Sequence, residues 1–200
     1  HTAIVVNKNG INRRKRDDKT EHSRPVKVLD KYIPAGSYSF VVEDASDISV
    51  GDRIQIRKPV TRKWVEYLEM HNLVRDGKPQ TWLSEGTLIA AEREVASVNG
   101  NRITLKVPLV DSYDAEYTEN QTTVIKAPVA SRVNRAGIEN LRIVSPPQAV
   151  NHVKALYYGI RIQGEDCWVR DVDLFETMES VGVGGHRITL QKVSVVRKSL

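Results

Sequence analysis

An apolar repeat in the last third of the chain constrains its fold more than any other feature. The spacing apolar-x-x-apolar-x-apolar occurs three times, and successive copies begin 31 and then 21 residues apart. The copies are Ile138/Leu141/Ile143, Val169/Val172/Leu174 and Leu190/Val193/Val195. The pairs Ile160/Ile162 and Val181/Val183 precede the second and third copies by the same nine positions. A repeating unit of this length, made of short strands, is typical of the coils of a parallel β-helix.

The longer first interval predicts one coil with an insertion. Its ten extra residues fit best within 145–154, where Pro146 and Pro147 disfavour regular structure. A β-sandwich with similar strands is the alternative fold, but it gives no reason for equal offsets. The repeat reaches the last residues, which favours a β-helix that continues beyond residue 200.

Composition supports an all-β chain with a separate module before the repeat. Val and Ile together number 41, against 24 for Leu and Ala, and β-branched side chains favour pleated sheets over helices. Apolar and polar positions alternate between turn residues over 26–127. We predict a strand and basic loop over 1–25, an antiparallel β module over 26–127, and the first β-helix coils over 128–200.

Two local signals mark elements within the antiparallel module. Asn99-Gly100 separates two alternating runs and predicts a β-hairpin with a type I′ turn. Thr61 is a suitable N-cap, and the apolar spacing after it predicts one helix over 61–71.

Charge and cysteine usage narrow the class of partner. The net charge is +5, and four consecutive basic residues occupy 13–16. This run could contact a polyanion, but a solvated loop is the commoner case and no aromatic residues interleave it, so we expect no nucleic-acid partner. Cys167 is the sole cysteine and is expected to be a small buried hydrophobe. No apolar stretch approaches the roughly 18 residues of a membrane-spanning helix.

Two segments resemble the right-handed parallel β-helix of the pectate-lyase-like superfamily, the pectin-lyase fold. They are AGIENLRI at 136–143 and YGIRIQGEDCWVRDV at 158–172. Residues 41–54 and the helix with Trp64 look like the β module near the N-terminus of some bacterial members. The resemblance implies an all-β chain in which a small antiparallel module with one short helix precedes a right-handed parallel β-helix. It also implies a secreted, periplasmic or cell-surface protein whose partner is a polysaccharide, most often an acidic one.

In that superfamily the substrate lies along the first strand of each coil and the loop before it, and the repeat maps these strands to 159–163 and 181–184. Strand alternation then points Arg161, Gln163, Gly182 and Gly184 outward. A polyuronate lyase needs a base for the C5 proton and a cation for the neighbouring carboxylate. The candidate catalytic residues are His152, Lys154, Arg161 and His186. The candidate substrate-binding residues are Tyr157, Tyr158, Gln163, Glu176 and Glu179.

The outward positions depart from two patterns of the superfamily. Calcium-dependent lyases place carboxylates there, whereas this chain has Arg, Gln and two Gly, so we predict no metal site and no evident cofactor. Calcium stays open as a cofactor, but the outward residues of these coils do not support it. The paired aspartates of β-helix hydrolases are also missing. Other columns, meaning sets of equivalent positions in successive coils, are expected to have structural roles. Asn140, Asp171 and Lys192 share a position suited to a left-handed bend, and Arg142 and Asp173 are expected to form a surface ion pair.

Three functions remain open from the sequence. The leading hypothesis is a secreted β-helix protein that acts on polysaccharide, as a lyase that cleaves acidic glycan by β-elimination. The alternative is a β-helix protein without catalytic activity that binds glycan or builds a surface structure. A basic nucleic-acid-binding protein rests on charge alone, and it would show steeply salt-dependent binding.

Overall fold

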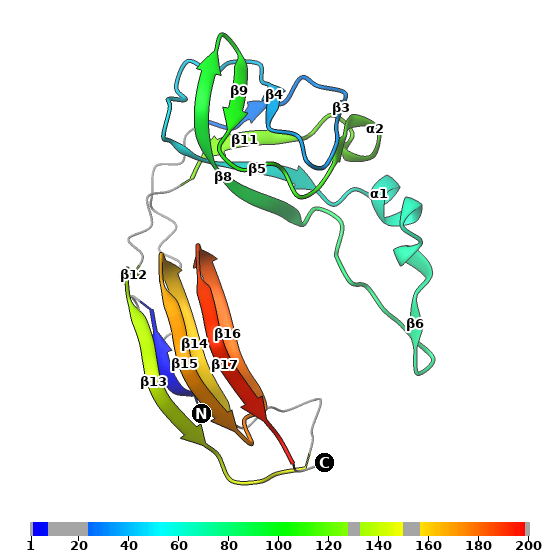
Figure 1. Cartoon of the computed structure of the whole chain (residues 1–200). Helices are drawn as coiled ribbons and strands as arrows, with labels where there is room; N and C mark the ends of the chain where they lie inside the picture. Colours follow the sequence, from blue (N-terminus) through cyan, green and yellow to red (C-terminus); the bar gives the residue numbers. More distant parts are fainter. Residues whose placement is uncertain (1, 8–23, 128–132, 150–156, 199–200) are drawn as a thin grey trace. The chain divides into compact units, whose positions relative to one another are not determined.

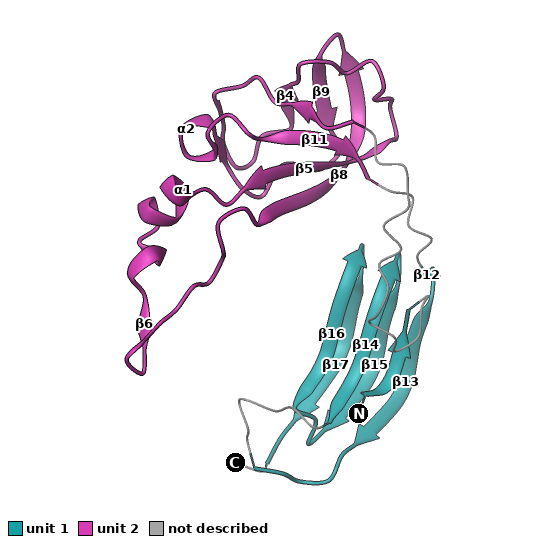
Figure 2. Cartoon of the chain, turned by 180° about the vertical axis from the view of Figure 1, so that it is seen from behind, with its two compact units in different colours: residues 1–17, 130–200 teal, residues 18–129 magenta. Residues whose placement is uncertain are grey.

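The computed structural model describes residues 2–7, 24–127, 133–149 and 157–198 and divides the chain into two compact units. Residues 1–17 and 130–200 form the β-helix unit, and residues 18–129 form the antiparallel module (Figure 2). Strands dominate both units, which confirms the predicted all-β fold class. No helix in the described ranges is long and apolar enough to cross a membrane.

The β-helix unit consists of parallel strands in two sheets (Figure 1). Its strands are β1 (Thr2–Val6), β12 (Val133–Asn134), β13 (Gly137–Val144), β14 (Tyr158–Glu165), β15 (Trp168–Phe175), β16 (Glu179–His186) and β17 (Thr189–Val196). One sheet joins β14 to β1, β12 and β16, and the other has the order β13-β15-β17. All of these pairings are parallel, as stacked coils require.

The strand register confirms the sequence repeat. Ile160 pairs with Val181 and Val169 pairs with Leu190, both 21 residues on. Ile138 pairs with Val169 across the 31-residue interval. The coils formed by β14–β15 and β16–β17 each contain two eight-residue strands where three shorter ones were predicted, because the second strand bends without interruption.

Left-handed residues make these bends. Asn140, Asp171 and Lys192 have φ angles of 55°, 51° and 50°, which confirms the predicted column. A second column with φ near these values contains Arg135, Asp166 and Arg187, at the corner between the two sheets. Asn and Asp adopt this conformation more readily than most residues, so the bend positions follow partly from local propensity.

Apolar side chains from both sheets fill the interior of the coils. The buried members of this core are Ile138, Ile160, Ile162, Cys167, Val169, Val172 and Leu174. Cys167 is therefore the small buried hydrophobe that was expected. Val183 pairs with the buried Ile162 and lies on the inward face as predicted. It is nevertheless 56% exposed, because β16 pairs with a described strand, β14, along one edge only.

The first strand of the chain belongs to the β-helix, which the sequence repeat did not reveal. Ile4 pairs with Ile160 and Val6 pairs with Ile162. The strand β16 occupies one edge of β14. The other edge is therefore shared by two strands, β1 along residues 158–162 and β12 along residues 164–165. Two strands far apart in sequence therefore complete one coil, and the antiparallel module is inserted between them.

The antiparallel module is built around a six-stranded sheet of order β2-β11-β5-β8-β9-β4. Its elements in chain order are β2 (Val26–Lys27), β3 (Tyr32–Ile33), β4 (Ser39–Val41), β5 (Arg53–Pro59), α1 (Arg62–Tyr67), η1 (Met70–Asn72), β6 (Val74–Arg75), β7 (Lys78–Pro79), β8 (Leu88–Asn99), β9 (Arg102–Leu105), β10 (Tyr113–Asp114), α2 (Ala115–Thr118) and β11 (Thr123–Lys126). Apolar side chains including Phe40, Ile54, Ile56 and Ile103 form its own core.

The hairpin and the helix predicted within the module are both present, but each differs in detail from the prediction. The predicted hairpin joins β8 to β9, but Asn99 pairs with Arg102, so the loop residues are Gly100 and Asn101. A positive φ occurs at Gly100 and not at Asn101, which is a type II′ turn and corrects the predicted type I′. The helix starts after its Thr61 cap as predicted. It ends at Tyr67 because Glu69 is left-handed, and a separate short 3-10 helix follows.

Candidate functional site

Arg161 and Gln163 lie on the outer face of β14, where strand alternation places them opposite the buried Ile160 and Ile162. Their neighbours on the next coil are Gly182 and Gly184. A Cβ atom at Gly182 would lie 3.6 Å from Arg161 Nε, and one at Gly184 would lie 3.3 Å from Gln163 Cγ. Both side chains therefore extend over glycines of β16, whereas β1 places Val5 beside Arg161 on the other edge of β14.

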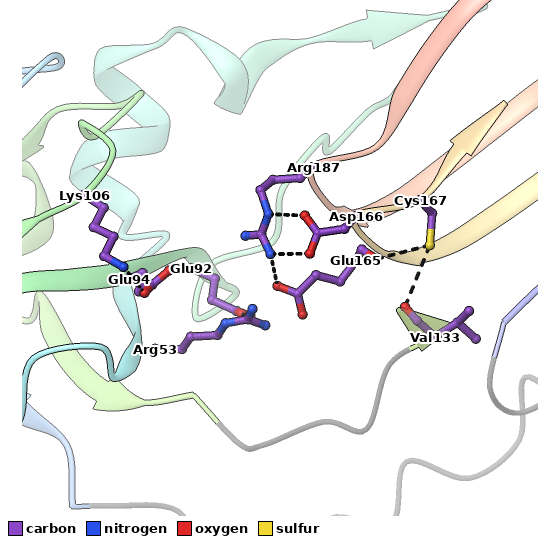
Figure 3. A network of polar contacts seen from close by, with 9 residues as sticks. All are labelled: Arg53, Glu92, Glu94, Lys106, Val133, Glu165, Asp166, Cys167 and Arg187. Atoms are coloured by element: carbon purple, nitrogen blue, oxygen red, sulfur yellow. Dashed lines mark hydrogen bonds and ion pairs between the residues drawn. The ribbon is translucent and has the colours of Figure 1, made fainter. Parts of the chain in front are cut away.

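The carboxyl end of the same sheet holds a group of charged residues (Figure 3). Arg187 contacts both oxygens of Asp166, at 2.5 and 2.9 Å, and its Nη2 donates to Glu165 Oε1 at 2.7 Å. Asp166 and Arg187 occupy the same left-handed column of successive coils, so the 21-residue register itself creates this ion pair. The arginine offsets part of the negative charge of the two adjacent carboxylates.

His186 ends β16 and pairs in register with Glu165 on β14. This places an imidazole and a carboxylate in neighbouring positions of adjacent coils. His186 was named as a candidate from the sequence, and Glu165 was not. The signal that could have found Glu165 is the repeat itself, because Glu165 precedes His186 by 21 positions.

The two ends of this face cannot serve a single reacting atom. Gly182, beside Arg161, and His186 are four residues apart on one strand, which corresponds to about 13 Å at 3.3 Å per residue. A saccharide that contacts both would do so through different sugar units. The described part of the face is therefore an extended polar surface, with Arg161 and Gln163 in one place and His186 with Glu165 in another.

The other predicted substrate-binding residues lie around the start of this sheet. Tyr158 is half-buried and pairs with Thr2 and Glu179, and the Tyr157 carbonyl accepts a hydrogen bond from Met178 N at 2.9 Å. Glu179 is exposed as the first residue of β16. The tyrosines and Glu179 are thus close in the fold, at the opposite end of the strands from His186.

Glu176 has a local structural contact. It sits at the corner after β15 with a φ of 57°, and its carboxylate accepts a hydrogen bond from Lys198 N at 2.9 Å. His152 and Lys154 lie outside the described residues. Within the described ranges, no group of three His, Cys, Asp or Glu side chains is arranged to hold a metal ion.

The antiparallel module has charged pairs of its own, one between β5 and β8 and one between β8 and the residue that follows β9 (Figure 3). Arg53 Nη1 lies 3.8 Å from Glu92 Oε1, and Lys106 pairs with Glu94. These pairs join neighbouring strands and their side chains are partly exposed, so each contributes up to about 1 kcal/mol to stability.

No protein-family model matches the chain, and no curated protein matches it. Its fold is partly similar to solved structures of phage tailspikes. The tailspike gp49 of Pseudomonas phage LKA1 is 11% identical with a TM-score of 0.45, and the match covers 100% of this chain and 32% of that one. The gp54 tailspike of Acinetobacter baumannii bacteriophage AP22, solved in complex with A. baumannii capsular saccharide, is 14% identical with a TM-score of 0.39, covering 87% of this chain and 33% of that one.

A third similar structure is the tailspike gp61 of Pseudomonas phage phi297. It is 13% identical with a TM-score of 0.35, and the match covers 84% of this chain and 31% of that one. The chain thus spans about a third of the length of each of these three proteins.

Proposed function

We propose that this chain is part of an extracellular β-helix protein that binds an acidic polysaccharide along the outer face of β14 and β16. The observation that supports this most is Arg161, whose guanidinium extends over the bare backbone at Gly182. A guanidinium binds carboxylates through two parallel hydrogen bonds, so an outward arginine beside a glycine of the next coil suits a uronate unit.

The residues around Arg161 fit the same ligand class. Gln163 is exposed one outward position further along β14, and its amide can both donate to and accept from sugar hydroxyls. The two glycines opposite leave room for these two side chains to lie flat over β16. The net charge of +5 favours an anionic partner in general.

Calorimetric titration with polygalacturonate tests this proposal. Arg161→Ala should weaken binding about tenfold or more, because a charge-assisted hydrogen bond contributes about 1.5–3 kcal/mol. Arg102→Ala is the matched control, since Arg102 is an exposed strand arginine of the antiparallel module. Equal affinities of the wild type and Arg161→Ala would reject this face as the binding site.

Cleavage by β-elimination is a second candidate function, supported by His186 beside Glu165. A carboxylate next to an imidazole stabilises the imidazolium that forms when histidine accepts a proton. Arg161 then serves to bind a sugar unit at some distance from the base. Incubation with polygalacturonate, alginate and hyaluronan, followed by the ultraviolet absorbance of unsaturated product, measures this activity. We expect His186→Ala to abolish product formation, and absence of product from the wild type on all three polymers would reject cleavage.

A further inference from the structure

A pair of tyrosines joins the two α-helices of the antiparallel module. The rings of Tyr67, at the end of α1, and Tyr117, in α2, have centroids 4.3 Å apart and are tilted by 36°. Tyr67 is 62% exposed, so one side of its ring faces Tyr117 and much of the remainder faces solvent. The solvent-facing part of this ring is an aromatic surface that a ligand can reach.

Several contacts hold the pair in place. The Thr61 hydroxyl caps α1 by accepting from Trp64 N at 3.1 Å, and it donates to the carbonyl oxygen of Tyr117 in α2. Lys63 Nζ bridges the same helices by pairing with Glu116 Oε1 at 3.0 Å, and it lies 5.7 Å from the centroid of the Tyr117 ring. The rings are therefore positioned before any ligand arrives, which lowers the entropy lost on binding.

We propose that this surface, defined by Tyr67, Tyr117, Lys63 and Glu116, binds a sugar ring of a polysaccharide. The C–H face of a pyranose packs on the exposed ring of Tyr67, and the ammonium of Lys63 and the carboxylate of Glu116 bind its hydroxyls. An aromatic face bordered by a hydrogen-bond donor and an acceptor matches the amphipathic surface of a sugar. The proposal shares its ligand class with the proposed function but concerns a separate surface on the other unit of the chain.

Affinity electrophoresis of the whole chain tests the proposal, in native gels cast with polygalacturonate, alginate or hyaluronan. In a gel that retards the wild type, Tyr67→Ala should weaken the apparent affinity about two- to tenfold, and Tyr67→Phe should retain it. Tyr38→Ala is the matched control, because Tyr38 lies in the same module and is 53% exposed. It should migrate like the wild type.

Arg161→Ala separates this inference from the proposed function. If Arg161→Ala loses retardation while Tyr67→Ala keeps it, the tyrosine surface is rejected and the β-helix site stands. The reverse result supports the tyrosine surface and rejects the β-helix site. Absence of retardation in all three gels rejects both. A change in the sedimentation coefficient of Tyr67→Ala without a change in retardation would show a contact between copies of the chain and would also overturn the inference.

Discussion

At the scale of single residues, the close contact between Gly137 and Trp168 shows how a residue in one coil restricts the residue type allowed in the adjacent coil. The indole of Trp168 lies so close to Gly137 that a Cβ atom there would be 2.1 Å from Trp168 Cε2. The indole nitrogen donates to the carboxylate of Glu139, which also pairs with Arg170 at 2.8 Å. Glycine is therefore required at position 137 by its neighbour on the adjacent coil.

Gly137→Ala should destabilise the β-helix unit by about 1–3 kcal/mol, because the methyl group must displace the indole ring. Urea unfolding followed by tryptophan fluorescence measures the change. Gly182→Ala is the control, since a Cβ there would be 3.6 Å from the nearest side-chain atom, and it should change the free energy of unfolding by less than about 0.5 kcal/mol. Equal destabilisation by both substitutions would contradict the described packing.

Glu139 should also make stability depend on pH. The hydrogen bond from Trp168, and next the one from Arg170, lower the pKa of Glu139 below its ordinary value of 4.5. A carboxyl whose pKa is lower in the folded state stabilises the fold above the unfolded pKa, and this contribution is lost as the pH falls through the folded pKa. Urea midpoints measured between pH 7 and pH 3 should therefore fall less steeply for Glu139→Gln than for the wild type. Parallel curves would show that Glu139 makes no such contribution.

The candidate site was predictable where the repeat alone fixes the positions. Strand alternation around Ile160 and Ile162 was sufficient to place Arg161 and Gln163 outward. The role of Glu176 was not predictable, because its carboxylate accepts a hydrogen bond from the backbone amide of Lys198, 22 residues later. Sequence spacing does not reveal such a corner contact, since it depends on the direction of one side chain.

At the scale of elements, the strands β13 to β17 were predictable as parts of the β-helix. An N-terminal strand was also predicted, but its place in the β-helix as β1, beside β12, was not. The visible repeat depends on equal offsets, and Ile4 precedes Ile138 by 134 positions whereas Ile160 precedes Val169 by nine. An insertion of the whole antiparallel module therefore removes the first coil from the periodic pattern. The apolar alternation of Ile4 and Val6 matches that of Ile160 and Ile162, but a two-residue match so far away is not distinctive.

Ile4→Ala tests the assignment of β1 to the β-helix. Loss of the partly buried side chain should cost about 1–3 kcal/mol and expose the edge of β14. Hydrogen exchange should accelerate for amides in 158–165 and stay unchanged in β5 and β8 of the antiparallel module. Ala3→Ser, at an exposed position of the same strand, is the control and should leave both regions unchanged. Unaltered exchange in β14 of Ile4→Ala would show that β1 does not stabilise this strand.

At the scale of the whole molecule, the chain is a β-helix with a self-contained module inserted into its first coil. The two ends of the module meet, because Val26 of β2 pairs with Val124 of β11. Inserted domains commonly have adjacent ends, since the host fold then tolerates them with little distortion. The module also has its own apolar core, which gives it the means to fold alone.

A fragment of residues 24–127 should therefore fold independently. We expect a cooperative thermal transition and dispersed amide resonances for the isolated fragment, because its six-stranded sheet and core need no residue of the β-helix unit. A fragment without a cooperative transition would show that the module depends on the rest of the chain.

The most direct test of the account is an amide NMR titration of the 15N-labelled chain with polygalacturonate oligosaccharide. If an acidic polysaccharide lies along the outer face of β14 and β16, the amides of Arg161, Gln163, Gly182 and Gly184 should shift together, with a single apparent affinity. The buried core of the antiparallel module, such as Ile54 and Ile103, should not respond. Saturable shifts that leave β14 and β16 unchanged, or no shifts at all, would contradict the proposed binding face.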